Sequence, residues 1–253
     1  MTNSYNLIKF ISYAVILIAV FLFEIEITNA ESSNETLGRF INKTFLDQTV
    51  DKIPGTLPVY CFQMNFYSSD SVNISFGFEK ANFAYKKDGE NFLIVNAYQK
   101  KDMLFVLNTD NSITLIDSVW TGIPSNSRFI GVSGSDAERE FDRILNNKII
   151  AGEYFSFWEN KPTGKRIIFQ SDGVIAGMDN YNRYSICYSG DCIEETKTPS
   201  NIIYLINHEG AEVPYAFKKS IADGSINIYE LGPQIKDIKG ERTIDGQIFD
   251  LRK

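Results

Sequence analysis

The sequence predicts a mainly β protein, built from antiparallel strands in meander or barrel modules, with two short amphipathic helices. Three observations support this fold class. Short runs of aromatic and β-branched residues recur between breaks that contain Asp, Asn or Gly. Aromatic residues make up 13% of the chain and hydrophobic residues 43%, which is more than a disordered chain carries. With 253 residues, the chain is long enough to bury one large core or two smaller ones.

The N-terminal segment, residues 1–30, differs from the rest and predicts export. Lys9 precedes the apolar run of residues 10–23, and small residues precede a cleavage point after Ala30, as in a secretory signal peptide. The alternative is an uncleaved anchor, because residues 7–23 approach the roughly 20 residues that cross a bilayer. Either interpretation predicts that the folded part is periplasmic or extracellular.

Residues 31–134 are predicted to form a helix followed by an antiparallel β-meander. Apolar residues recur at helical spacing between Ser32 and Ile53, and Ser32 with Glu35 fits a capping box. Strand-like runs follow, broken by polar turns such as the Asp-Gly pair at residues 88–89. We therefore expect consecutive strands of this half to pair with one another.

A connecting helix and a second β module follow. Residues 135–150 have one apolar face, and Ser135 with Glu138 fits a second capping box. Residues 151–253 contain strand-like runs at regular spacing, which predict a closed or nearly closed antiparallel barrel. The charged tail, residues 233–253, is expected to wrap the surface of this barrel.

The second module resembles a known family over residues 152–232. Its opening glycine, Gly152, stands near Tyr154 and Trp158, and is followed by "IIFQSDG", a strand that carries Tyr184, and the closing run "DGSINIYEL". This pattern is similar to that of the small lipocalin-like β-barrel domains of bacterial envelope proteins. The resemblance implies a barrel that could enclose an apolar cavity, and it transfers no catalytic residue to this chain.

The cysteines of the stretch "YSICYSGDCIEE" predict a disulfide. Cys187 and Cys192 flank a Tyr-Ser-Gly-Asp turn, and opposed positions of an antiparallel hairpin lie within disulfide reach. In an exported protein such a pair is more often oxidised than metal-bound. A zinc site would need further ligands, and only Cys61, which is expected to be a buried thiol, and His208 remain. We predict no metal site.

Catalytic motifs are incomplete, so we assign no catalytic residue. The stretch "GVSGSD" resembles a nucleophile elbow but has Ser135 where the motif needs glycine. A secreted hydrolase that uses Ser133 and His208 remains an alternative hypothesis. The sequence also lacks a glycine-rich phosphate loop, a dinucleotide fingerprint and an EF-hand loop, and it predicts no cofactor.

Charge argues against a nucleic-acid partner. The formal net charge is -7, and the basic residues occur in short, separated clusters without an aromatic nucleic-acid signature. Contact with a membrane is predicted only through an uncleaved N-terminal segment. The remaining partner classes are a small apolar ligand and another protein.

The leading hypothesis is an exported, non-catalytic binding or envelope-associated protein that holds a small apolar ligand in a β-barrel. Aromatic residues of the second module are the candidates for lining the ligand pocket: Tyr154, Phe157, Trp158 and Tyr184. Core packing is the simpler explanation for most of these side chains. A further alternative is a host-interacting or inhibitory protein that acts through an exposed aromatic patch.

Overall fold

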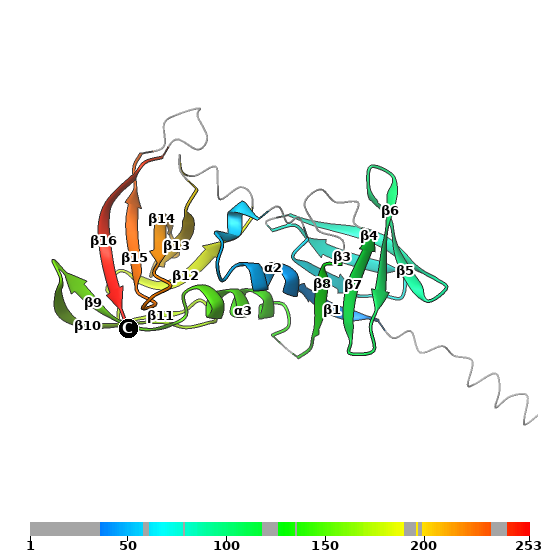
Figure 1. Ribbon diagram of the computed structural model, residues 1–253, viewed down its shortest axis with the longest axis horizontal. Coiled ribbons are helices and arrows are strands. Elements are labelled where there is room, and N and C mark those ends of the chain that lie inside the picture. The colour runs from blue at the N-terminus through cyan, green and yellow to red at the C-terminus, as the bar shows by residue number, and fades with distance from the viewer. Residues whose placement is uncertain are drawn as a thin grey trace, which may run out of the picture. The chain divides into compact units, whose positions relative to one another are not determined.

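The computed structural model describes residues 36–57, 61–77, 79–117, 126–134, 136–189, 196, 199–233 and 242–253. The segment from Leu37 to Lys253 forms one unit, in which two eight-stranded antiparallel sheets follow one another (Figure 1). The mainly β fold class predicted from the sequence is therefore confirmed. The proposed export signal lies outside the described residues, as do Ser32 and Glu35 of the first predicted capping box.

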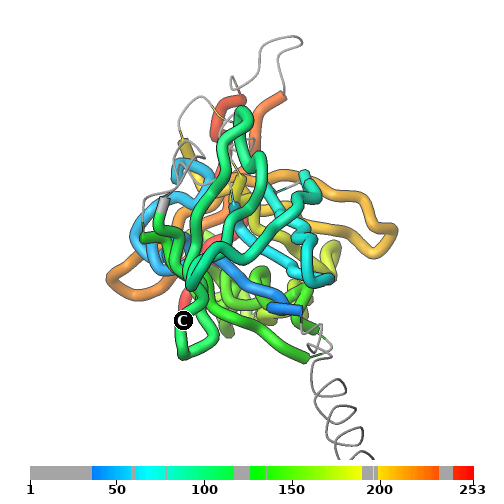
Figure 2. Tube along the Cα trace, turned by 90° about the vertical axis from the view of Figure 1, so that its right-hand side faces the viewer, coloured from blue at the N-terminus to red at the C-terminus, as the bar shows by residue number. Residues whose placement is uncertain are grey.

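The first sheet is a closed barrel in which each strand pairs with the next, and β1 pairs with β8. Figure 2 shows the up-and-down path of the chain through β4 to β7. The expected meander thus closes on itself. Its strands are β1 (Gly38–Asn42), β2 (Gln63–Phe66), β3 (Ser71–Ser75), β4 (Lys80–Asp88), β5 (Asn91–Tyr98), β6 (Lys101–Leu107), β7 (Ser112–Asp117) and β8 (Arg128–Val132).

Side chains fill the interior of this barrel. Strand β2 shows the alternation, because Met64 and Phe66 are buried while the intervening side chains are half-buried. The rings of Phe92 and Phe105 stack with centroids 5.2 Å apart. Cys61 is a buried free cysteine, as predicted, and desolvation raises the pKa of its thiol well above the usual value.

The second sheet has the spatial order β11-β10-β9-β16-β15-β14-β13-β12. Its end strands approach at one antiparallel bridge, between Val174 and Arg183, so this barrel is nearly closed, as the sequence predicts. Its strands are β9 (Gly152–Trp158), β10 (Lys161–Phe169), β11 (Ile175–Ala176), β12 (Tyr181–Cys187), β13 (Asn201–Asn207), β14 (Glu212–Lys219), β15 (Ile226–Leu231) and β16 (Ile244–Arg252).

The expectation that the charged tail wraps the surface was wrong for Ile244–Arg252. These residues form β16, which pairs with both β15 and β9 and so joins the two ends of the second module. The strand has few consecutive apolar residues, but Leu251 is fully buried in the core. Backbone pairing on both sides therefore stabilises a segment whose composition gives only a weak strand signal.

The long helix predicted between Ser32 and Ile53 was wrong over much of its length. Gly38–Asn42 is strand β1, and the helix α2 is confined to Lys43–Gln48, followed by a short 3-10 turn at Pro54–Thr56. Asn42 ends the strand and caps the helix, because its side chain accepts a hydrogen bond from the backbone N–H of Phe45. Pairing of β1 with β2 and β8 overrides the helical spacing of the apolar residues.

The second helix is present but starts later than its predicted capping box. Helix α3 spans Glu140–Ile149, and the residue before it, Arg139, makes no side-chain capping bond. Ser135 lies outside the described residues, and Glu138 forms an ion pair with Lys80 at 3.5 Å. The apolar face of α3 contributes Phe141, Leu145 and Ile149 to the core, as its periodicity predicts.

An aromatic cluster links the two helices with strand β12. It consists of Phe45 of α2, Phe62 before β2, Phe141 of α3 and Tyr188 after β12. Phe141 lies 6.0 Å from Phe45 and 5.0 Å from Tyr188 between ring centroids, and Phe62 lies 4.8 Å from Tyr188. This cluster fixes α3 in front of the end of β12, which positions the site described below.

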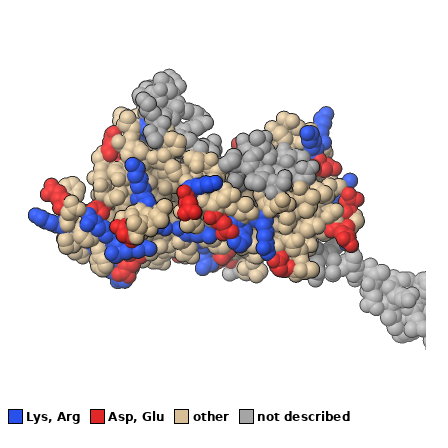
Figure 3. Space-filling view, in the orientation of Figure 1, with Lys and Arg blue, Asp and Glu red and all other residues tan. Residues whose placement is uncertain are grey.

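Charged side chains of both signs are mixed on the face shown in Figure 3, without a continuous basic patch there. None of the helices within the described residues combines the length and hydrophobicity that a membrane span requires.

Candidate functional site

Two of the predicted pocket residues, Tyr154 and Tyr184, are core residues of the second module. Both are almost fully buried, and Phe169 packs between their rings. The Tyr154 hydroxyl donates to the Ile150 carbonyl at 2.8 Å, and the Tyr184 hydroxyl donates to the Gln170 carbonyl at 2.7 Å. Desolvation raises the pKa of Tyr154 to about 12. Packing and internal hydrogen bonds therefore account for both tyrosines.

The other two, Phe157 and Trp158, lie away from that core, so the structure does not assemble the four residues into one pocket. Trp158 is 64% exposed. The Arg252 guanidinium stacks 4.3 Å from the centre of the Phe157 ring. Both aromatic residues line a separate surface cavity of about 250 Å³, together with Asn160 and Gln247.

The alternative hydrolase pair is not assembled by any contact of the described residues. Ser133 is exposed just after β8, and His208 is exposed in the turn between β13 and β14. The Nε2 atom of His208 lies 3.3 Å from the Asp179 carbonyl oxygen. Within the described part of the chain, no group of three His, Cys, Asp or Glu side chains is arranged to hold a metal ion.

The predicted disulfide stays a prediction because Cys192 lies outside the described residues. Its partner Cys187 is buried at the end of β12, with its sulfur 4.0 Å from the Tyr204 hydroxyl. Cys187 belongs to a small apolar cluster on the outer face of the second sheet, with Ile202 and Ala216.

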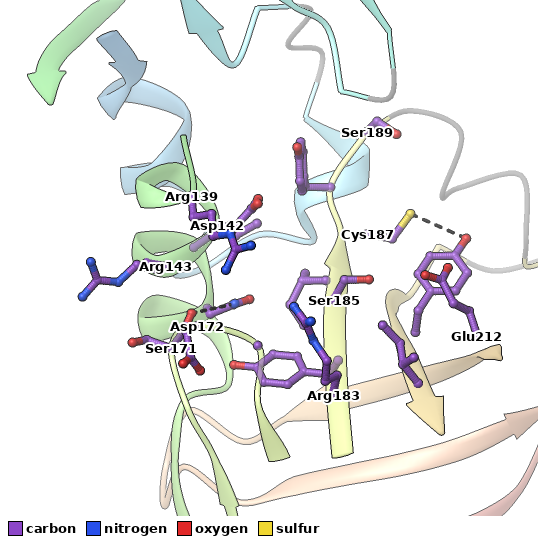
Figure 4. A pocket seen from close by; sticks show the side chains of 18 of the residues that line it. Arg139, Asp142, Arg143, Ser171, Asp172, Arg183, Ser185, Cys187, Ser189 and Glu212 are labelled. Atoms are coloured by element: carbon purple, nitrogen blue, oxygen red, sulfur yellow. Dashed lines mark hydrogen bonds between the residues drawn. The ribbon is translucent and has the colours of Figure 1, made fainter. Parts of the chain in front are cut away.

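A cleft of about 340 Å³ lies between α3 and β12 (Figure 4). Its lining includes the consecutive residues 184–189, which are the second half of β12 and the two residues after it. Side chains of neighbouring strand residues point to opposite faces, so an unbroken run of lining residues means that the cleft follows the edge of the strand. Arg139, Asp142 and Asn146 line the helical wall.

The floor of the cleft is held by contacts from the turn between β10 and β11. Asn146 of α3 donates its side-chain amide to the Ser171 carbonyl at 2.9 Å, which ties this turn to the helix. The Tyr184 N–H donates to the Gly173 carbonyl at 2.8 Å, which ties it to β12. Gly173 has a φ of +86°, and a Cβ there would lie 2.9 Å from the Tyr184 carbonyl oxygen. A glycine is therefore required where the turn approaches the strand.

The backbone of Ile186 points into the cleft. In an antiparallel pair, alternate residues bond to the partner strand and the others face away from it. Tyr184 donates to Gly173 rather than to β13, so the residues of β12 that bond to β13 are Arg183, Ser185 and Cys187. By the same alternation, the N–H and C=O of Ile186 face the cleft. Neither group forms a hydrogen bond with another described residue.

Two arginines extend into the cleft from opposite walls. Figure 4 shows Arg139 and Arg183 directed into the space between α3 and β12, whereas Arg143, which also lines the cleft, extends its guanidinium to the other side of α3. Arg143 pairs with Glu140 at 3.1 Å. Neither Arg139 nor Arg183 forms an ion pair with a described residue. Their charges are thus available to a ligand.

None of the described acidic side chains that line the cleft forms an ion pair with Arg139 or Arg183. The Asp172 carboxylate accepts a hydrogen bond from the Val174 N–H at 3.1 Å. Glu212 lies on β14, two strands away from Arg183, with Ile206 of β13 between them. Two strand spacings separate the Cα atoms of Glu212 and Arg183 by about 10 Å. Partial burial by the cleft walls raises the pKa of Asp142, although the charge of Lys80 opposes the shift.

The cleft continues into a neighbouring cavity of about 260 Å³ with which it shares Gly77, Arg139, Asp142 and Tyr188. This extension adds polar groups from the first barrel, including the side chains of Arg39, Asn65 and Asn73. Gly77 allows the close approach of the two walls, because a Cβ there would lie 2.8 Å from the Cβ of Ser189. The combined site is an elongated polar groove.

Comparison with protein-family models, curated proteins and solved structures gives no match to this chain. Function must therefore be argued from the site itself. The sequence singled out Tyr184 as a pocket residue but missed the arginines and the strand edge beside it. The alternation of exposed Arg183 and Ser185 with buried Tyr184 and Ile186 was the available signal, but it does not reveal that one edge of the strand is open.

Replacing Asp142 with asparagine is expected to stabilise the protein slightly at neutral pH. The folded pKa of Asp142 lies above its ordinary value of 3.8, so folding favours the protonated form. Its contribution to stability is fully present below the unfolded pKa and is lost as the pH rises through the folded pKa. Because water still reaches this carboxylate from the open side of the cleft, the penalty is screened, and we expect a gain below about 1 kcal/mol at pH 7, vanishing near about pH 3.5.

Urea unfolding at both pH values measures this difference. Asp136→Asn is the matched control, because Asp136 is exposed in the turn before α3 and lies outside the cleft. A loss of stability in Asp142→Asn at neutral pH would show that the charged carboxylate has a stabilising partner in the folded protein.

Proposed function

We propose that this chain is an exported, non-catalytic binding protein whose ligand occupies the cleft between α3 and β12. One observation supports this proposal: the cleft contains both an open strand edge and two arginines that form no ion pair with a described acidic residue. Hydrogen-bonding groups and charges that converge on one concavity, without partners of their own, are typical of ligand sites.

The proposal places the ligand outside the barrels. The interior side chains of both sheets belong to buried clusters, and the tyrosines expected to line an apolar cavity are hydrogen-bonded core residues. The cleft, in contrast, opens to solvent and offers polar groups. We therefore expect a polar ligand rather than the small apolar molecule that the sequence favoured.

Export and the disulfide belong to the same proposal. The apolar run of residues 10–23 and the small residues before Ala30 support secretion of the folded part. An oxidising compartment would allow Cys187 to pair with Cys192 at the end of the cleft strand. On reduction, the denatured mature protein is expected to gain about 2 Da, which intact mass spectrometry detects.

Native mass spectrometry of the protein purified from its own source tests whether the cleft is occupied. We expect a bound mass that denaturation removes. Ser185 is exposed and lines the cleft, so Ser185→Trp should fill the site and abolish that mass. Lys87→Trp places the same ring at an exposed position of β4 and should leave binding unchanged.

Two results would contradict the proposal. A bound mass that persists in Ser185→Trp would place the ligand elsewhere on the molecule. A chain that carries no bound mass, and that gains none when incubated with the peptide and small-molecule fractions of its own medium, would leave the cleft without a ligand. Circular dichroism of both variants verifies that the substitutions leave the fold intact.

A further inference from the structure

We propose that the ligand of the cleft is an extended acidic peptide that adds to the open edge of β12 as a further strand. This inference rests on the proposed function and names the chemical class of the ligand. It is carried by three features of the described residues: a free backbone edge, room beside it, and two arginines that form no ion pair with a described residue.

The edge supplies the backbone hydrogen bonds. The N–H and C=O of Ile186 face away from β13, as a partner strand requires, whereas the Tyr184 C=O already lies against Gly173. Strand β11 and the turn before it cover only the beginning of β12, because the pairing reaches no further than the bridge from Val174 to Arg183 and the bond from the Tyr184 N–H to the Gly173 carbonyl. The remaining edge is a site for β-strand addition.

The cleft supplies the space. From Tyr184 to the end of β12 at Cys187 the lined edge extends over about 10 Å, which is enough for about three residues of an added strand. A partner strand lies about 4.8 Å from its neighbour, and the cleft occupies the region directly beside β12, in front of α3 (Figure 4). The adjoining cavity lets the peptide continue beyond Tyr188.

The side-chain environment selects an alternating sequence. One face of an added strand would lie on the side of Tyr184 and Ile186, next to Leu145 of α3, and favours apolar residues. The charges of Arg139 and Arg183, which lack acidic partners among the described residues, favour carboxylates. We therefore expect apolar residues to alternate with glutamate or aspartate in the bound segment.

The test uses three synthetic, acetylated seven-residue peptides and the full mature protein. In the first peptide valine alternates with glutamate, and in the second valine alternates with lysine. The third has the first sequence with N-methyl groups on alternate residues, which removes the hydrogen bonds of one edge. Fluorescence anisotropy measures affinity, and two-dimensional NMR measures the hydrogen exchange of the Ile186 amide.

The glutamate peptide is expected to bind and to slow exchange at Ile186. The lysine peptide should bind at least about tenfold more weakly, which is the scale expected for two charge contacts. The peptide N-methylated on the edge that faces β12 should not bind. The double variant Arg139→Glu/Arg183→Glu should reverse the preference between glutamate and lysine, whereas Lys87→Glu, at an exposed position of β4 outside the cleft, should leave it unchanged.

Several outcomes would overturn the inference. Equal affinity for the two charged peptides would show that the arginines do not select the ligand. Binding without slower hydrogen exchange of the Ile186 amide would show that the peptide does not pair with the edge of β12. A dimer of the unliganded protein that the glutamate peptide dissociates would identify a second copy as the natural occupant. Failure of all three peptides, combined with a native bound mass that Ser185→Trp abolishes, would refute the peptide class and leave the proposed cleft function standing.

Discussion

Replacing Phe141 with alanine is expected to lower the free energy of unfolding by about 3–5 kcal/mol. The Phe141 ring is fully buried and contacts the rings of Phe45, Phe62 and Tyr188. Truncation would remove these contacts and leave a cavity where α2, α3 and the end of β12 meet. Because this cluster positions α3 beside β12, the variant should also disturb the cleft.

Urea unfolding monitored by fluorescence measures the effect. Phe155→Ala is the matched control, because this phenylalanine of β9 is 47% exposed and should cost less than about 1 kcal/mol. Equal losses in the two variants would mean that the aromatic cluster does not organise the core around α3.

Replacing Gly177 with alanine is expected to cost about 3 kcal/mol or more. Gly177 follows β11 with a φ of +84°, and a Cβ there would lie 1.9 Å from the Arg166 carbonyl oxygen. The backbone of this turn must therefore move to accept the substitution. Gly210→Ala is the control that measures backbone strain without a steric clash. Gly210 has a φ of +86°, but nothing lies within 4 Å of a Cβ at this position.

Thermal and urea unfolding of the two glycine variants give the comparison. Gly210→Ala should cost only the backbone strain, about 1–2 kcal/mol. If Gly177→Ala loses no more than Gly210→Ala, the close approach of the turn to β10 does not constrain the folded chain, and the path of the chain from β11 into β12 would need revision.

Local patterns predicted most of the fold. The strands of the second module follow runs such as "GEYFSFW", in which Tyr154 and Ser156 are buried and Phe155 between them is exposed, and α3 follows its apolar stripe. The failures occur where partners distant in sequence decide the structure. The spacing of Phe40 and Ile41 is compatible with a helix, but both residues belong to strand β1, which pairs with β2 and β8. Strand β16 likewise depends on β9, which is far from it along the chain.

The candidate site was less predictable for a related reason. Residue types identified Tyr184 and Cys187 as features of one strand, but the edge of that strand becomes a site only because the chain before Gly173 turns away from β12 into β10. Arg139 and Arg183 meet at the cleft through the tertiary position of α3, which the aromatic cluster sets. The spacing of residues in the sequence does not predict that Arg139 and Arg183 line the same cleft.

Residue-resolved hydrogen exchange along β12 in the unliganded protein tests the central claim most directly. The structure predicts slow exchange at Tyr184, Ser185 and Cys187, whose amides are bonded, and fast exchange at Ile186, which lies between them with its amide facing the cleft. If Ile186 exchanges as slowly as its neighbours, the edge is already covered and the cleft offers no free backbone to a ligand.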